Sequence, residues 1–182
     1  EFQQVFGRAA AGDNDFNGLI TEYFIDDAEI ILVALGSIIG TIKDVVDQER
    51  ANGIKVGVLG ITSFRPFPSD EVRKRLKHGQ KIVVVERAFA PGIGGIVSSN
   101  IRTALGGIEI DIRTVVAGLG GRPVTTNTIK DIIGKALYGA LPEFSFSDLN
   151  VELVEREVER NLASRRSGPM AENLLKDLGG AR

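Results

Sequence analysis

"IILVALGSIIGTIKDVVDQERANGIKVGVLGI", residues 30–61, is the stretch that decides the fold. It begins and ends with nearly continuous apolar runs, 30–35 and 55–61, which are typical of strands buried on both faces. Between them, 38–52 carries an apolar residue every three or four positions and charged residues on the other side, which is the pattern of an amphipathic helix. Two buried strands joined by a helix predict a βαβ unit and therefore a parallel sheet.

The rest of the chain repeats this alternation. Strand-like apolar runs occur at 81–85 and at 111–117. A third strand is expected at 19–24, where apolar and polar residues alternate as in a half-exposed edge strand. Helical patterns follow at 96–105 and 126–137. We therefore predict an α/β fold in which a mostly parallel sheet of five strands has helices on both faces.

Three parts are expected along the chain: 1–18 as the end of a preceding domain, 19–141 as the α/β domain, and 142–182 as a helical tail or arm. The tail offers only a narrow apolar seam, too thin for a core of its own. The seam residues are Val151, Val154, Val158 and Leu162. Two readings stay open, a solvated amphipathic helix and an arm that grips another chain. The first residue is Glu1 rather than methionine, so fragment, processed piece and natural subunit also remain open.

Composition excludes several classes of function. The chain has no cysteine and one histidine, which removes thiolate ligation of an iron–sulfur cluster, a structural zinc site and a cysteine nucleophile. Lys and Arg total 22 against 24 Asp and Glu, without a basic tract, so nucleic acid is not an expected partner. No apolar run approaches the roughly 20 residues that span a bilayer. The sequence therefore predicts a soluble, cytoplasmic protein that binds neither nucleic acid nor membrane.

Ligands of open α/β sheets bind outside the carboxyl ends of the strands, and four loops are expected at that edge. These loops are 36–37, 63–68, 86–95 and 118–122. Gly36 and Ser37 most simply cap the helix that follows them. Glu86 and Arg87 end a strand and point to opposite faces of the sheet. The Glu86 carboxylate could act as a general base, but an ion pair at a domain boundary is the favoured interpretation.

Glycines at 92, 94 and 95 precede an expected helix. Gly92, Gly94 and Gly95 could let backbone N–H groups approach an anion at the start of that helix. The dinucleotide fingerprint is not met, because it would require glycine where Val97 stands, and no phosphate-loop motif occurs in the chain. Close packing of a helix, a strand or a neighbouring domain is the favoured role for these glycines.

The loop SFRPFP, residues 63–68, combines a stiff backbone with large side chains. Its two prolines restrict the preceding residues to extended conformations with about three residues per turn, which places Phe64 and Phe67 on one face beside Arg65. Such a rigid aromatic pair loses little entropy on docking and could anchor an interface. The alternative is that both rings cover this domain's own core.

Four motifs carry a resemblance to a known family. They are VALGSIIGTIKDVVD (33–47), GIKVGVLGITSFRPFP (53–68), KIVVVERAFAPGIGGIVSSNIRTAL (81–105) and VAGLGGRPVT (116–125). In this order and spacing they resemble domain II, the transketolase carboxyl-terminal-like domain, of the alpha subunit of pyruvate:ferredoxin oxidoreductases. The resemblance implies a three-layer αβα domain with strand order 1-3-2-4-5 and an antiparallel first strand at the edge. It also implies a crevice with 36–37 on one side and 86–87 on the other, and loops that face other domains.

The same resemblance implies a role without catalytic residues, cofactor ligands or metal ligands in this chain. In the family, a 2-oxoacid is oxidised to acyl-CoA and carbon dioxide with thiamine diphosphate and Mg, and 4Fe-4S clusters pass the electrons to ferredoxin. Those groups lie on other domains or subunits, so the expected partners are these parts of an oligomeric enzyme, with ferredoxin for the complete assembly. Alternatives are the same domain in another 2-oxoacid oxidoreductase, in transketolase or in a dehydrogenase beta chain, and an independent module that binds a small anion.

Overall fold

The structure, a computed structural model, describes residue 5, residues 18–76 and residues 81–164. Most of the predicted amino-terminal segment, 1–18, and the predicted tail beyond 164 lie outside these residues. The chain divides into two compact units, the first ending at Ser147 and the second beginning at Asp148. Among the described residues, no helix has the length and apolar character needed to cross a membrane.

A single mixed sheet forms the centre of the first unit. Its strands are β1 (Ile20–Tyr23), β2 (Ile30–Leu35), β3 (Val56–Ile61), β4 (Lys81–Glu86), β5 (Ile112–Val116) and β6 (Phe144–Phe146). The spatial order is β1-β3-β2-β4-β5-β6, with β1 antiparallel to β3 and every other pair parallel. The expected order of the first five strands and the antiparallel edge strand are therefore confirmed.

The expectation of five strands is wrong, because β6 joins the sheet beside β5. Thr114, Val115 and Val116 of β5 pair in parallel register with the three residues of β6. A strand of three residues is too short for an alternating pattern to be recognised in the sequence. Since β6 belongs to the sheet, the first unit extends past the predicted domain end at Leu141 to Ser147.

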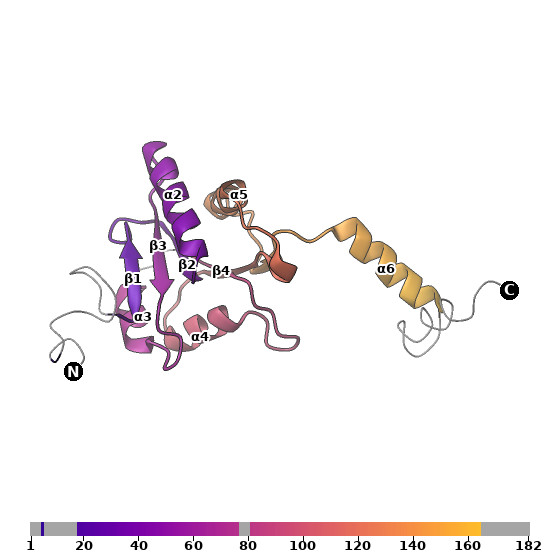
Figure 1. Ribbon diagram of the computed structural model, residues 1–182, viewed down its shortest axis with the longest axis horizontal. Coiled ribbons are helices and arrows are strands. Elements are labelled where there is room, and N and C mark those ends of the chain that lie inside the picture. The colour runs from indigo at the N-terminus through magenta and orange to yellow at the C-terminus, as the bar shows by residue number, and fades with distance from the viewer. Residues whose placement is uncertain (1–4, 6–17, 77–80, 165–182) are drawn as a thin grey trace. The chain divides into compact units, whose positions relative to one another are not determined.

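Helices cover both faces of the sheet (Figure 1). In the described part of the first unit they are α2 (Ile38–Ala51), α3 (Ser69–Arg75), α4 (Ile96–Ala104) and α5 (Thr126–Leu137), with a short 3-10 turn, η1 (Leu119–Gly121). The buried residues of α2 and α5 share one apolar cluster, and those of α3 and α4 share the other. The three-layer αβα architecture is thus confirmed.

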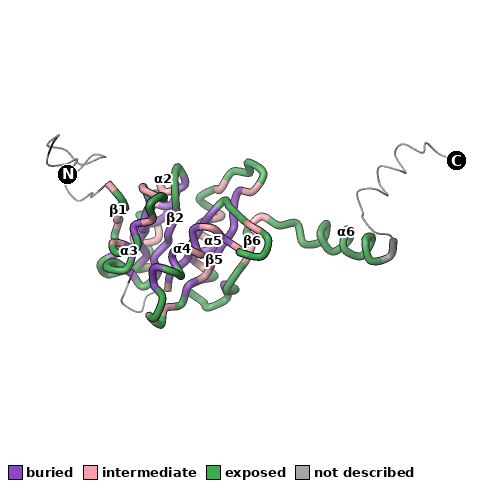
Figure 2. The backbone as a smooth tube through the Cα atoms, turned by 90° about the horizontal axis from the view of Figure 1, so that it is seen from below, coloured by how far each residue is buried: buried purple, intermediate pink, exposed green. Residues whose placement is uncertain are grey.

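Alternation along the central strands explains why the sheet has an apolar cluster on each face. In β2, Leu32 and Ala34 belong to the cluster under α2 and α5, whereas Ile31 and Val33 belong to the cluster under α3 and α4. Burial of such aliphatic side chains stabilises the fold by about 1.5–3 kcal/mol each. Figure 2 accordingly shows the central strands as buried.

The second unit contains α6 (Val151–Ser164). Its first turn is capped by the side chain of Asn150, which accepts a hydrogen bond of 3.0 Å from the backbone N–H of Leu153. The apolar seam expected from the sequence is present and exposed within the described residues (Figure 2). The helical part of the predicted tail is thus confirmed from 151 to 164, and a partner for its seam stays a prediction.

Candidate functional site at the carboxyl edge of the sheet

A crevice opens where the chain leaves β2 and β4 toward opposite faces. These neighbouring strands are parallel, but β2 continues into α2 on one face and β4 continues toward α4 on the other. Ligand sites of open α/β sheets occur at such switch points. A cavity of about 280 Å³ lies here. It is lined by Leu35, Ile38, Val85, Glu86, Arg87, Ala88 and Val97.

Glu86 is buried at this crevice, with 5% of its surface exposed. One carboxylate oxygen accepts a hydrogen bond of 2.7 Å from the backbone N–H of Val97, and the other accepts one of 3.0 Å from Ser98. The carboxylate therefore caps the start of α4, where negative charge is favoured by the helix dipole. Within the described residues both oxygens bind amides rather than a cation, and the expected ion pair at a domain boundary stays a prediction.

The loop that contains Gly92, Gly94 and Gly95 leaves room for the Glu86 carboxylate at the start of α4. Gly92 and Gly94 have φ angles of 84° and 85°, a backbone conformation that glycine adopts without strain. Ala90 and Gly94 exchange two backbone hydrogen bonds of 2.8 Å, which close the turn. A methyl group on Gly95 would overlap the Glu86 carboxylate. Close packing therefore explains Gly95, whereas Gly92 and Gly94 are explained by their positive φ angles. The amides of Val97 and Ser98, in the first turn of α4, are already bound to Glu86.

Gly36 and Ser37 turn the chain from β2 into α2. Gly36 has a φ of 82°, and Ser37 occupies the position before the first helical residue. Ser37 is thus the N-cap residue of α2, as expected, but its side chain makes no capping hydrogen bond. The structure places this pair beside the crevice, whose wall is made by the flanking residues Leu35 and Ile38.

Arg87 follows Glu86 and lines the same crevice. Its side chain is exposed and, within the described residues, has no hydrogen bond or ion pair. Its guanidinium lies close to Gly118, where a side chain would meet the Arg87 Nε. The two loops at 86–95 and 118–122 are thus neighbours at this edge, and the Arg87 charge is available to a binding partner.

The aromatic pair of the SFRPFP loop lies partly inside the molecule. Phe64 and Phe67 are half-buried against the cluster under α3 and α4, with ring centroids 6.1 Å apart and ring planes at 90°. Arg65 is exposed, stacks on the Phe64 ring at 4.0 Å and donates a hydrogen bond of 3.3 Å to the side chain of Asn100. The Arg65–Pro66 peptide bond is cis.

An aromatic cluster at the β5–β6 end of the sheet was missed by the sequence analysis. The ring centroids of Phe89, Phe144 and Phe146 lie 5.2–5.8 Å apart. Phe89 is 42% and Phe144 37% exposed, and the neighbouring Ile93 is exposed as well. The Phe-x-Phe spacing of 144–146, which places both rings on one face of a strand, was the available signal. We call these three rings the aromatic cluster.

Comparison with known proteins identifies a family. The profile described as "Pyruvate:ferredoxin oxidoreductase core domain II" matches residues 28–129. Pyruvate synthase subunit PorA of Methanosarcina barkeri is 37% identical over 161 residues, which cover 85% of this chain and 39% of that protein. Ketoisovalerate oxidoreductase subunit VorA of Pyrococcus abyssi is 34% identical over 134 residues, covering 72% of this chain and 32% of that protein. The chain thus spans about two fifths or less of the length of these relatives.

The solved structures agree on the fold. A 2-oxoglutarate:ferredoxin oxidoreductase from Magnetococcus marinus superposes with a TM-score of 0.54 and 23% sequence identity. The match covers 66% of this chain and 20% of that one. At this level of identity the likeness concerns the fold of the first unit.

Proposed function

Because the chain belongs to the family of pyruvate:ferredoxin oxidoreductase core domain II, we propose that it is a non-catalytic structural and assembly module of a pyruvate:ferredoxin oxidoreductase alpha subunit. The complete enzyme would oxidise pyruvate to acetyl-CoA and carbon dioxide and reduce ferredoxin. Thiamine diphosphate, Mg and 4Fe-4S clusters would be held by other domains or subunits. We expect this oligomer in the cytoplasm, where ferredoxin is available.

The residues of this chain do not fit those cofactors. Iron–sulfur clusters need cysteine thiolates as ligands, and the chain has none. Among the described residues, no group of three or more His, Asp or Glu side chains could hold a metal ion. The buried carboxylate at the crevice, Glu86, has both oxygens engaged by helix amides, so it is not poised as a general base. The chemistry is therefore assigned to other polypeptide.

The observation that carries the assembly role is the exposed aromatic cluster at the carboxyl edge. Aromatic side chains supply most of the energy of many protein interfaces, and arginine is also enriched there. Phe89 and Phe144 expose their rings. Arg87, which has no partner among the residues that the structure describes, lies at the adjacent crevice. Phe64 and Phe67 cover part of this domain's own core and expose the rest, so docking through Arg65 is a secondary part of the same proposal.

An independent anion-binding module is the weaker alternative. It requires free amides at the glycine loop, but those of Val97 and Ser98 donate to Glu86. The match over 28–129 likewise favours the oxidoreductase over transketolase or a dehydrogenase beta chain. A pyruvate synthase subunit and a ketoisovalerate oxidoreductase subunit are both similar to this chain. The experiment below therefore compares several 2-oxoacids as substrates.

The experiment is reconstitution of the enzyme from its parts. The chain is affinity-tagged, its companion polypeptides are identified, and coenzyme A-dependent reduction of ferredoxin is measured with pyruvate, 3-methyl-2-oxobutanoate and 2-oxoglutarate. We expect activity with pyruvate only when this chain is present together with its companions. Activity of the companions without this chain, or turnover by this chain alone, would refute the assembly role.

A surface variant tests which face docks. The double substitution Phe89→Ser with Phe144→Ser should lower the affinity for the companions at least about tenfold, because interface aromatics contribute about 2 kcal/mol or more. Tyr138→Ser, at the exposed end of α5, is the matched control and should bind normally. Normal binding by a double variant with unchanged melting temperature would exclude the aromatic cluster as the docking surface.

A further inference from the structure

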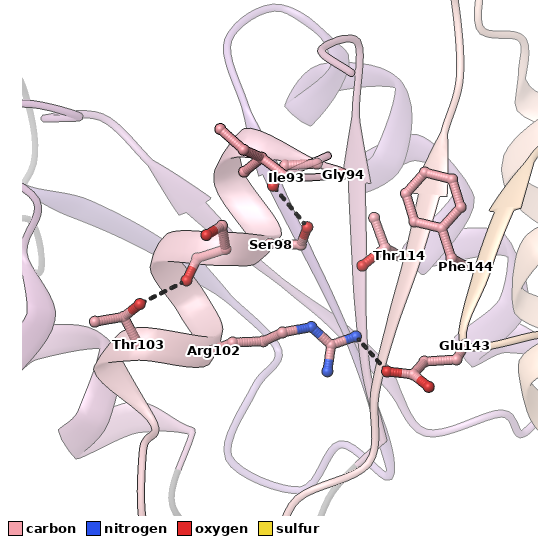
Figure 3. A pocket seen from close by; sticks show the side chains of 10 residues that line it. Ile93, Gly94, Ser98, Arg102, Thr103, Thr114, Glu143 and Phe144 are labelled. Atoms are coloured by element: carbon pink, nitrogen blue, oxygen red, sulfur yellow. Dashed lines mark hydrogen bonds and ion pairs between the residues drawn. The ribbon is translucent and has the colours of Figure 1, made fainter. Parts of the chain in front are cut away.

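A second and larger pocket, of about 460 Å³, lies between α4 and the strands β5 and β6 (Figure 3). Its size is in the range of small-molecule sites. The pocket is lined by Ile93, Gly94, Gly95, Ser98, Ser99, Arg102, Thr103, Thr114, Glu143 and Phe144. The proposed assembly role uses none of its polar groups.

Thr114 is the residue that marks this pocket as a binding site. It lies in the middle of β5 and is 1% exposed. Its backbone is paired within the sheet, but within the described residues its hydroxyl has no hydrogen-bond partner. In Figure 3 the hydroxyl points into the pocket, toward the space between Ser98 and Arg102. Buried hydroxyls without a partner are rare and costly, so a group inside the pocket is expected to satisfy this one.

Arg102 supplies a fixed cation on the opposite wall. One guanidinium nitrogen donates a hydrogen bond of 2.9 Å to the backbone carbonyl of Ile112. The same nitrogen lies 3.3 Å from a carboxylate oxygen of Glu143. A guanidinium has five N–H donors in a planar fork, so the other nitrogens remain able to bind a carboxylate. The ion pair therefore holds the arginine in place and leaves donors for a ligand.

Glu143 contributes a carboxylate at the mouth of the pocket, where its side chain is 75% exposed. Ile93 and Phe144 contribute an apolar wall. The Ser99 hydroxyl adds a further polar group without a partner in the described part of the chain. One cation, one anion, hydroxyls and an apolar surface thus meet in one cavity.

We propose that this pocket binds a small α-amino acid with an apolar side chain. Its carboxylate is held by Arg102 and the Thr114 hydroxyl, its ammonium group by Glu143, and its side chain contacts Ile93 and Phe144. A phosphate ligand fits less well, because Glu143 would repel it and the nearby amides of α4 are bound to Glu86.

The test uses three probes of similar shape against the intact protein that contains this chain. L-leucine carries both charged groups, 4-methylpentanoate lacks the ammonium group, and 3-methylbutylamine lacks the carboxylate. Binding is measured by titration calorimetry up to about 10 mM, which detects dissociation constants in the millimolar range. We expect L-leucine to bind at least about tenfold more tightly than either analogue, since each analogue loses one charged contact.

Variants assign the binding to this pocket. Glu143→Gln should weaken L-leucine about tenfold but should not weaken 4-methylpentanoate, because the hydrogen bond to the Ile112 carbonyl still holds Arg102. The isosteric Thr114→Val should weaken both. Thr41→Val, on α2 at the opposite face of the sheet, is the control and should change neither. Absence of L-leucine binding, equal binding of 4-methylpentanoate, or L-leucine binding that Glu143→Gln does not weaken would overturn the proposal. The exposed Glu143 side chain keeps the test valid if Thr114→Val does not fold.

Discussion

Replacement of Glu86 by glutamine tests the central feature of the carboxyl edge, the carboxylate that caps α4. Glutamine has nearly the same shape but only one acceptor oxygen, so one of the two amide hydrogen bonds to Val97 and Ser98 is lost. In place of the lost acceptor, a side-chain NH₂ group faces a backbone N–H, and both donors are left unsatisfied. The helix dipole also loses its compensating charge.

The magnitude follows from these two contacts. Losing one hydrogen bond to a charged group costs about 1.5–3 kcal/mol, and the remaining bond becomes a neutral one of about half the strength. Because Glu86 is buried, solvent does not screen these losses. We expect the free energy of unfolding of the first unit to fall by about 3 kcal/mol, which lowers the melting temperature by roughly 6–12 °C.

The assay is urea and thermal denaturation of the full chain, with amide hydrogen exchange at 97 and 98 as a local readout. Exchange at these two amides should accelerate in the variant. Glu109→Gln, an exposed carboxylate, is the matched control and should change stability by less than about 0.5 kcal/mol. If Glu86→Gln is as stable as this control, the carboxylate is not the cap that the structure shows.

Two further predictions concern the first unit. Gly95→Ala should destabilise it by about 2 kcal/mol or more in urea denaturation, because the added methyl group overlaps the Glu86 carboxylate. The control Gly40→Ala lies in α2 with open space around it and should stabilise the unit by up to about 1 kcal/mol. Equal effects of the two substitutions would contradict the close approach of Gly95 to Glu86. The hydrogen bond and charge of Arg50 lower the pKa of Asp27 from its ordinary 3.8, so the stability that Asp27 contributes is present above that pH and is lost as the pH falls through the lowered pKa. Stability measured from about pH 7 to about pH 3 should therefore fall less steeply for Asp27→Asn than for the natural chain, and identical slopes would show that the pair is not formed.

Several elements of the candidate site could be read from the sequence. Gly36 and Glu86 end apolar runs that only buried parallel strands explain, so their position at the carboxyl edge follows from the fold class. Phe64 and Phe67 were expected to lie on one face of their loop, and their ring centroids are 6.1 Å apart. The docking role of these residues stays a proposal.

Other elements of the candidate site could not be predicted from the sequence. Glu86 binds amides 11 and 12 residues further along the chain, and no local pattern distinguishes that cap from an ion pair. The aromatic cluster joins Phe89 to a strand more than fifty residues away, and the ligand pocket joins Arg102 of α4 to Thr114 and Glu143.

The sequence by itself determined the βαβ alternation, the two-sided burial of the central strands and the helix after β2. Each of these depends on side-chain periodicity within one element, which the chain carries locally. Tertiary structure alone decided that β6 completes the sheet, that Glu86 caps α4, and that the Thr114 hydroxyl lies across a pocket from Arg102. These features depend on which distant segments become neighbours, and that is settled only when the sheet and helices pack together.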